Sequence, residues 1–160
     1  MSAVLSDHIR EEIDHWVAKF PPDRKRSAVI ASLHAVQHEH GHLTAELMDA
    51  VADYLGLPNI QVYEVASFYS MFETKPVGRH HVSICTNISC MLRGSAEIVD
   101  HVEKKLGCKI GESTSAGRIY LKREEECLAA CVGAPMLMVD HVYHENLTPA
   151  AVDEILDELK

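Results

Sequence analysis

The chain has 160 residues, 47% of them hydrophobic, and its 15 Lys/Arg against 24 Asp/Glu give a formal net charge of −9 at pH 7. Such a length fits one domain or two small ones. The acidic balance argues against a nucleic-acid groove, which needs clustered positive charge, and against binding to anionic membrane surfaces. No apolar run approaches the ~18 residues of a membrane span. Residues 1–12 lack the pattern of a secretory signal or import leader, so we expect a soluble protein in a reducing compartment.

Helical periodicity runs through the first half of the chain. We expect helices over Leu5–Phe20, over Lys25–His40, from Thr44 to about Leu55, and over Asn59–Tyr69. Pro21-Pro22 separates the first two, because proline cannot continue a helix. Gly41 is typical of a helix end, and Thr44 is typical of an N-cap.

The segment from Lys75 to Gly78 predicts a domain boundary, because Pro and Gly interrupt regular structure. Beyond it the sequence predicts a strand, a helix, a strand, a hairpin and a last helix: His81–Cys85, Ser95–Leu106, Arg118–Lys122, Met136–Asp140 with Val142–His144, and a helix capped by Thr148 with Pro149 at its first position. This order indicates a sheet covered by helices. We therefore expect a helical domain over 1–75 and an α/β domain over 76–160.

Four of the five cysteines form two pairs in the second half, and only Cys108 stands outside them. Cys85 and Cys90 enclose four residues, Cys127 and Cys131 enclose three, and 36 residues separate the pairs. Each pair lies at or near the end of a predicted strand. If those strands are neighbours, the loops that follow them leave the same edge of the sheet, and four thiols converge there.

Four converging thiolates are the ligand set of a [2Fe–2S] cluster. Zinc sites usually have a two-residue gap, so the wider spacing favours a cluster, although zinc and metal-free buried thiols stay open as alternatives. A thioredoxin-like redox pair is disfavoured because no C-x-x-C is present. The small residues Gly133 and Ala134 are expected to let backbone N–H groups approach the sulfurs and tune the reduction potential. Cys108 is interpreted as a structural or surface thiol.

Three further groups have a structural interpretation beside a functional one. Glu124, Glu125 and Glu126 form a solvated turn, or they lower the potential of a nearby cluster, in which case replacing all three by Gln raises it. The histidines at 34, 38, 40 and 42 are interpreted as a solvated helix end rather than a metal site. An aromatic group is expected to be core, with a partner-binding patch as the alternative: Tyr63, Phe68, Tyr69, Met71 and Phe72.

The sequence also resembles a known family over about Phe20 to Lys160. The resemblance is carried by SAVIASLHAVQ at 27–37, GHLT at 41–44, VYEVASFYSMF at 62–72, and the C-x4-C and C-x3-C pairs, the second followed by Ala134-Pro135. The family is the 24 kDa-type (E-chain) subunit of respiratory NADH:quinone oxidoreductase, complex I. Two positions depart from its pattern. His42 replaces a frequent tryptophan, and Ala129 replaces a usual glycine, which affects the cluster potential more than cluster binding.

The resemblance implies an α+β fold, with an N-terminal helical bundle followed by a thioredoxin-like α/β [2Fe–2S] ferredoxin domain. It implies that Cys85 and Cys90 hold one iron of a single cluster and Cys127 and Cys131 the other. It implies docking against a flavin- and NADH-binding subunit and other peripheral-arm subunits, on the cytoplasmic face of the energy-transducing membrane. FMN and NADH are expected on the partner only, because this chain has no phosphate loop or dinucleotide fingerprint.

The expected role is therefore one-electron transfer inside an NADH-oxidising complex, with no catalytic residue in this chain itself. The same architecture occurs in NAD-linked hydrogenases and formate dehydrogenases, which remain alternatives. A zinc-stapled scaffold and a free-standing thiol oxidoreductase are alternatives from other classes. A homodimer or heterodimer of the isolated chain is compatible with the sequence. By analogy with thioredoxin-like folds, Pro135 is expected to follow a cis peptide bond.

Overall fold

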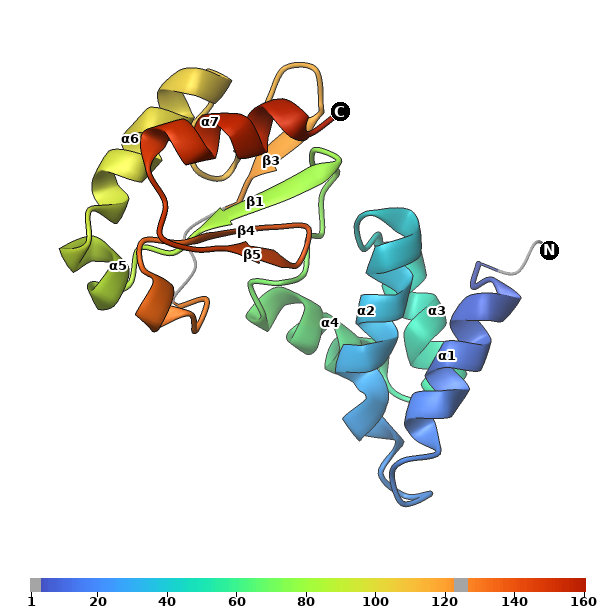
Figure 1. Cartoon of the computed structure of the whole chain (residues 1–160). Helices are drawn as coiled ribbons and strands as arrows, with labels where there is room; N and C mark the ends of the chain where they lie inside the picture. Colours follow the sequence, from blue (N-terminus) through green and yellow to red (C-terminus); the bar gives the residue numbers. More distant parts are fainter. Residues whose placement is uncertain (1–3, 123–126) are drawn as a thin grey trace. The chain divides into compact units, whose positions relative to one another are not determined.

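The computed structural model describes residues 4–122 and 127–160, and the chain divides into two compact units, Met1–Pro76 and Val77–Lys160 (Figure 1). The first unit is helical. The second contains a five-stranded sheet with helices. None of the helices in the described ranges is long and apolar enough to cross a membrane.

The first unit has helices α1 (Asp7–Val17), η1 (Lys25–Ala28), α2 (Val29–His40), α3 (Ala45–Leu55) and α4 (Asn59–Phe68). The predicted helices are confirmed, except that the second begins as a 3₁₀ turn. Thr44 caps α3 as expected, since its side-chain oxygen accepts a hydrogen bond from the N–H of Leu47 at 3.2 Å. Gly41 ends α2 with φ 78°, a conformation that glycine adopts without strain.

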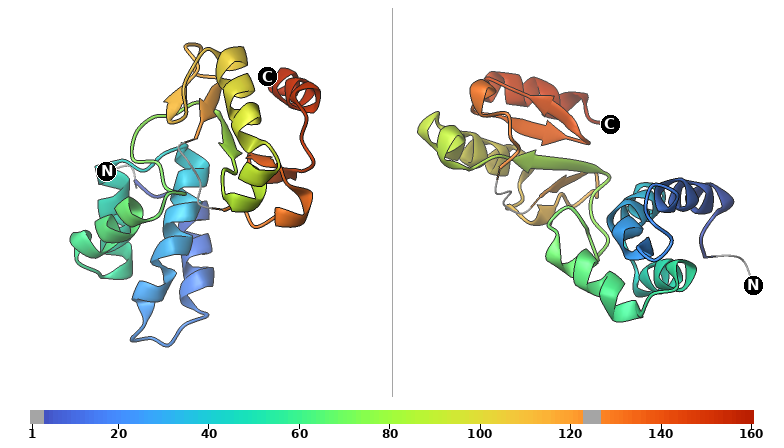
Figure 2. Two further views of the ribbon diagram at one scale, coloured as in Figure 1. Left: turned by 90° about the vertical axis from the view of Figure 1, so that its left-hand side faces the viewer. Right: turned by 90° about the horizontal axis from the view of Figure 1, so that it is seen from below.

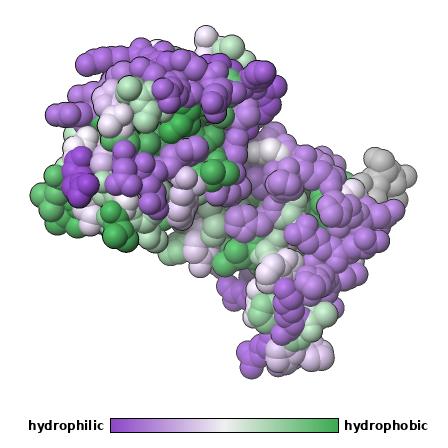
Figure 3. All heavy atoms as spheres, in the orientation of Figure 1, coloured by the Kyte–Doolittle hydropathy of each residue, from purple (hydrophilic) through white to green (hydrophobic). Residues whose placement is uncertain are grey.

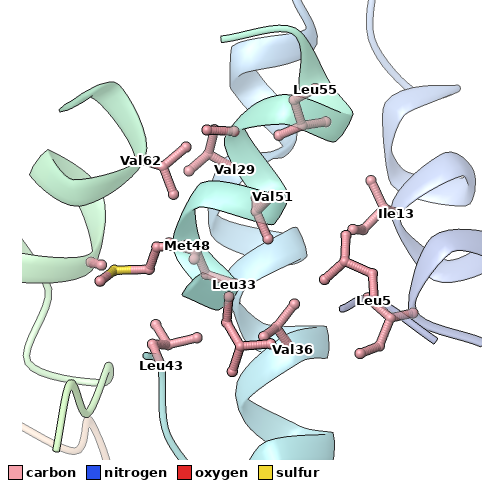
Figure 4. Packing of buried hydrophobic residues seen from close by; sticks show 14 of the residues in the cluster. Leu5, Ile13, Val29, Leu33, Val36, Leu43, Met48, Val51, Leu55 and Val62 are labelled. Carbon is pink, nitrogen blue, oxygen red and sulfur yellow. The ribbon is translucent and has the colours of Figure 1, made fainter. Parts of the chain in front are cut away.

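The core of the first unit lies between these helices (Figure 4). Figure 4 shows Leu33 and Val36 of α2 and Val51 of α3 among its side chains, and each of these is 0% exposed. The aromatic prediction is confirmed for Phe72, which is 1% exposed, but it is wrong for Phe68, which is 80% exposed. Tyr69 is 37% exposed because α4 ends at Phe68 and Tyr69 has an extended backbone, which takes its side chain off the buried stripe.

The second unit is built around a sheet of order β2-β3-β1-β4-β5. Its elements are β1 (His80–Ile84), α5 (Ile88–Leu92), α6 (Ser95–Leu106), β2 (Glu112–Ser113), β3 (Ile119–Leu121), η2 (Cys131–Gly133), β4 (Leu137–Val139), β5 (Val142–His144) and α7 (Pro149–Glu158). β1 runs parallel to β3 and antiparallel to β4. The two strands that were expected to precede the cysteine pairs are thus neighbours.

Helices α6 and α7 both pack on one face of this sheet (Figures 1 and 2). Alternate strand residues turn to that face because side chains along a strand alternate in direction. The shared core is made of Val82, Ile84, Ile119, Leu121, Leu137 and Val139 from the strands, Ile98 and Val102 from α6, and Val152 and Leu156 from α7. One helix-covered face fixes the register of the strands and therefore the position of the loops that follow them.

A histidine ties the first strand to the β4–β5 turn and to the last residue of the chain. His80 Nδ1 lies 2.6 Å from Asp140 Oδ2, and His80 Nε2 lies 3.0 Å from the main-chain oxygen of Lys160. Both ring nitrogens can donate only when the imidazole is protonated. The hydrogen bond to Asp140, and after it the bond to Lys160, therefore hold the pKa of His80 above its usual value.

We expect this histidine to make the second unit more stable in mild acid. Because the pKa of His80 is raised on folding, its contribution is full below the unfolded value of about 6.5 and is lost as the pH rises through the folded value. The contribution is at most about 1 kcal/mol, since Asp140 is 44% exposed and solvent screens the pair. Urea unfolding of the wild type and His80→Gln at about pH 5.5 and about pH 8 measures it.

The comparison between variants is needed because a neighbouring histidine acts in the opposite direction. Burial, and after it the charge of Lys122, lower the pKa of His81, so His81 favours folding at the higher pH. The wild-type curve alone contains both effects. A stability difference between wild type and His80→Gln that does not shrink with rising pH would contradict the assignment to His80.

Candidate metal centre

The four paired cysteines are placed by the ends of two neighbouring parallel strands. Cys85 directly follows β1, and Cys127 lies a few residues beyond the end of β3. Cys90 lies in α5, a short helix that the sequence did not predict and that is capped by the side chain of Asn87. Cys131 begins η2, which leads into β4. The two loops leave the same edge of the sheet, as the strand order requires.

The two pairs differ in their exposure to solvent. Cys85 is 2% exposed and Cys90 is 1% exposed, whereas Cys127 and Cys131 are exposed. The buried pair packs with apolar neighbours from the second loop and from β4: Leu128, Ala134 and Met136, with Ala130 and Met138 beside them. The site therefore has a buried apolar side and an open side.

Backbone hydrogen bonds join the buried pair to the second loop. The N–H of Cys85 donates to the carbonyl of Met136 at 3.2 Å. In return, the N–H of Met136 donates to the sulfur of Cys90, and the N–H groups of Leu128 and Asn87 donate to the sulfur of Cys85. Such N–H donors stabilise negative charge on sulfur, as a metal-bound thiolate requires.

The exposed pair has the spacing of two ligands on one ion. Cys127 Sγ lies 3.9 Å from Cys131 Sγ, which is far from a disulfide bond. Two thiolates that bind one tetrahedral metal ion with bonds of about 2.3 Å lie about 3.8 Å apart. The N–H of Ala129 donates to Cys127 Sγ at 3.3 Å, and the thiol of Cys127 also interacts with that of Cys85. Both pairs are therefore in contact.

The thiols perturb one another's ionisation. Burial raises the pKa of Cys85, but the N–H donors of Leu128 and Asn87 outweigh it and the pKa is lowered overall. Burial, and after it the neighbouring Cys85, raise the pKa of Cys90 to about 11. For Cys127 the Ala129 N–H lowers the pKa, but Cys131 and burial outweigh it. Four adjacent thiols cannot all ionise without a cation between them, and a metal centre supplies that positive charge.

The arrangement distinguishes between a single ion and a cluster. Within residues 4–122 and 127–160, no three His, Cys, Asp or Glu side chains are placed to hold one metal ion. A structural zinc needs four ligands around one centre. A [2Fe–2S] cluster needs two thiolates on each of two irons, and two contacting pairs of cysteines fit that requirement.

Comparisons with known proteins agree with this donor set. The profile of the family described as "Thioredoxin-like [2Fe-2S] ferredoxin" matches residues 13–160. The chain belongs to this family. It is 42% identical over 152 residues to an E-type subunit of NADH-quinone oxidoreductase from Rhizobium meliloti (strain 1021), covering 95% of this chain and 89% of the relative. It is also 42% identical over 154 residues to the E-type subunit from Rickettsia conorii (strain ATCC VR-613 / Malish 7), covering 96% and 90%.

The fold is also found among solved structures. An NAD⁺-reducing [NiFe]-hydrogenase in the air-oxidised state matches with a TM-score of 0.68 at 20% identity, over 79% of this chain and 22% of that one. The H2-reduced state matches with a TM-score of 0.64 at 21% identity, with the same coverage. These likenesses show the fold. Together with the family, they confirm the predicted thioredoxin-like α+β architecture and the electron-transfer class of this ferredoxin.

The structure corrects one expectation about the N–H donors of this ferredoxin. The N–H of Gly133 donates to the carbonyl of Ala130 at 3.0 Å, and that of Ala134 donates to the carbonyl of Cys131 at 3.4 Å, so neither approaches a sulfur. The donors to sulfur come from larger residues, such as Leu128 and Met136. The direction of an N–H group depends on the backbone turn, which the size of a residue does not reveal.

The other candidate residues lie apart from the sulfurs. Cys108 is 8% exposed in the core under α6, and burial raises its pKa, which agrees with a structural thiol. His34 Nε2 lies 3.1 Å from Met71 Sδ, while His38 and His40 are exposed. The acidic run at 124–126 lies outside the described residues, so its effect stays a prediction. The peptide bond before Pro135 is cis, as expected.

Ala129 carries backbone strain next to a sulfur. Its φ is +62°, a left-handed conformation that costs an alanine about 1 kcal/mol or more. We expect Ala129→Gly to stabilise the protein by roughly 0.5 kcal/mol, because relief of this strain exceeds the added freedom of the unfolded chain. Urea unfolding tests this. Ala130→Gly is the matched control, since Ala130 has φ −107° and should lose roughly 0.5–1 kcal/mol. Equal losses in both variants would contradict the prediction.

Proposed function

We propose that Cys85, Cys90, Cys127 and Cys131 bind one [2Fe–2S] cluster and that this chain carries single electrons in the NADH-oxidising module of NADH:quinone oxidoreductase. The observation that carries the proposal is the contact between two cysteine pairs, one of them with a 3.9 Å sulfur–sulfur distance. Relatives at 42% identity that are named as subunits of that oxidoreductase support the choice of complex.

The residues of the chain would divide the work between holding and exposing the cluster. When bound, the cluster supplies a one-electron redox centre. The N–H groups of Leu128 and Met136 would stabilise the thiolates of the buried pair, and the apolar residues around that pair would exclude water from it. Cys127 and Cys131 would form the exposed edge through which an electron enters or leaves.

An apolar surface beside the cysteines supports docking to a partner. Four hydrophobic side chains on α5 and η2 are exposed: Ile88 (62%), Met91 (54%), Leu92 (77%) and Val132 (98%). Figure 3 shows the hydrophobic surface over α5. Exposed apolar groups of this kind mark interfaces. We assign this surface to the flavin- and NADH-binding subunit, which would hold FMN and NADH and exchange electrons with this cluster.

Two further assignments belong to the same proposal. The units 1–75 and 76–160 would be separate domains, the first helical and available to other peripheral-arm subunits, the second holding the cluster. The second candidate function is the equivalent subunit of an NAD-linked hydrogenase, which the fold likeness favours. Sequence identity twice as high favours the quinone oxidoreductase.

The test is the metal and acid-labile sulfide content of anaerobically purified protein, with EPR spectra before and after dithionite. We expect two irons and two sulfides per chain and a rhombic S = 1/2 signal that arises on reduction. Stoichiometric zinc without sulfide, persisting after cluster reconstitution, would overturn the proposal in favour of a zinc-stapled scaffold.

A further inference from the structure

The turn that carries Cys131 is held by a segment that the cysteine pattern does not include. Residues 145–147 join β5 to α7 and run alongside this turn. The N–H of Asn146 donates to the carbonyl of Gly133 at 2.6 Å, and the N–H of Leu147 donates to the carbonyl of Pro135 at 3.0 Å. Leu147 is 6% exposed in the core under α6 and α7. The turn is therefore tied twice to a segment anchored in that core.

The side chain of Glu145 lies directly against Gly133. A Cβ atom added to Gly133 would come within 2.6 Å of Glu145 Cβ and would also meet its Cδ and Oε2 atoms. Gly133 has no left-handed φ, so its conformation does not demand glycine. The reason for glycine at this position is the space that the glutamate side chain fills.

This contact places a carboxylate beside a candidate ligand. Gly133 is the last residue of η2, the 3₁₀ turn that Cys131 begins. The Oε2 atom of Glu145 touches the turn itself, not only the segment that supports it. Asn146 directly after it has φ +53°, a conformation that asparagine tolerates better than most residues. The backbone bend and the two hydrogen bonds fix where this carboxylate lies.

We propose that Glu145 is a positioning residue whose fixed negative charge lowers the reduction potential of the cluster, an inference that rests on the proposed function. Reduction adds one electron to the cluster and therefore one negative charge. A carboxylate held beside the Cys127–Cys131 side repels that charge and favours the oxidised form. The two backbone hydrogen bonds keep the carboxylate at this turn in both oxidation states.

The test is an EPR-monitored redox titration of the full chain with its cluster, in the wild type and in Glu145→Gln. Gln keeps the length and packing of the side chain and removes its charge. We expect its midpoint potential to rise, with an equilibrium constant for reduction up to tenfold larger, which is a shift of up to about 59 mV for one electron. Added salt should narrow the difference, because it screens the charge.

Two further variants separate charge from packing and general acidity. Glu158→Gln removes an exposed carboxylate at the end of α7 and should leave the potential unchanged. Glu145→Asp keeps the charge but shortens the side chain. If charge acts, Asp stays nearer to the wild-type potential than Gln. If packing alone acts, Asp moves the potential at least as far as Gln, and the proposal is overturned.

The possible failures can be told apart. A wild type without iron and sulfide removes the proposed function itself. A wild type with a complete cluster, and a Glu145→Gln potential within the shift of the Glu158→Gln control, removes only the role of Glu145. If Glu145→Gln loses its cluster, Glu145→Asp decides, because a potential equal to the wild type supports the charge and a larger shift than the control overturns it.

Discussion

Replacing Cys90 by alanine is expected to abolish the visible absorption and the EPR signal of the cluster, with loss of iron and sulfide. Cys90 is 1% exposed, and its sulfur accepts a hydrogen bond from the N–H of Met136. Without it, one iron keeps a single protein thiolate, and the apolar residues around the site offer no replacement ligand. Alanine is preferred to serine because a hydroxyl could take the place of the sulfur.

Cys108→Ala is the matched control for this loss. Cys108 is also buried, at 8% exposure, but it packs in the core under α6 and not with the paired cysteines. It should keep the full cluster content and lose only about 1 kcal/mol of stability from the removed sulfur. A complete cluster in Cys90→Ala, or equal iron loss in both variants, would contradict the proposed ligand set. Iron and sulfide analysis after reconstitution measures both.

The ligand pairs could be predicted because their information is local in the sequence. Spacing defines each pair, and strand periodicity before Cys85 and in Ile119–Leu121 places the pairs at the ends of strands. Parallel pairing of β1 and β3 then brings the two loops together. Helix ends were equally local, since Thr44 and Thr148 each cap the helix they precede with a side-chain hydrogen bond.

What the sequence did not predict depends on contacts between distant residues. The exposure of Phe68 follows from the extended backbone that ends α4, although its spacing looks like that of a core residue. The five-residue helix α5 is too short to show a periodic pattern. The contact between Gly133 and Glu145 joins residues whose proximity only the folded chain reveals. In each case tertiary structure overrides local preference.

Replacing Gly78 by alanine should destabilise the second unit by about 2–4 kcal/mol. A Cβ at this position would lie 2.6 Å from the backbone nitrogen of Tyr120 and 2.7 Å from the carbonyl oxygen of Ile119. These backbone atoms belong to β3, which pairs on both sides and cannot retreat without breaking its ladders. Moving the Gly78 segment instead would stretch the hydrogen bond that its N–H donates to Ser113 Oγ at 2.9 Å.

Gly117→Ala isolates the steric part of this effect. Gly117 has φ +65° and nothing within 4 Å of its added Cβ, so its replacement costs only the left-handed backbone, about 1 kcal/mol. Gly78 has no left-handed φ, so its loss must come from the clash with β3. Thermal unfolding should place the midpoint of Gly78→Ala lower than the wild type by more than about 8 °C, a larger drop than in Gly117→Ala. Equal midpoints for the two variants would mean that β3 yields to the methyl group, and the close approach of Gly78 would then not be what holds this end of the sheet together.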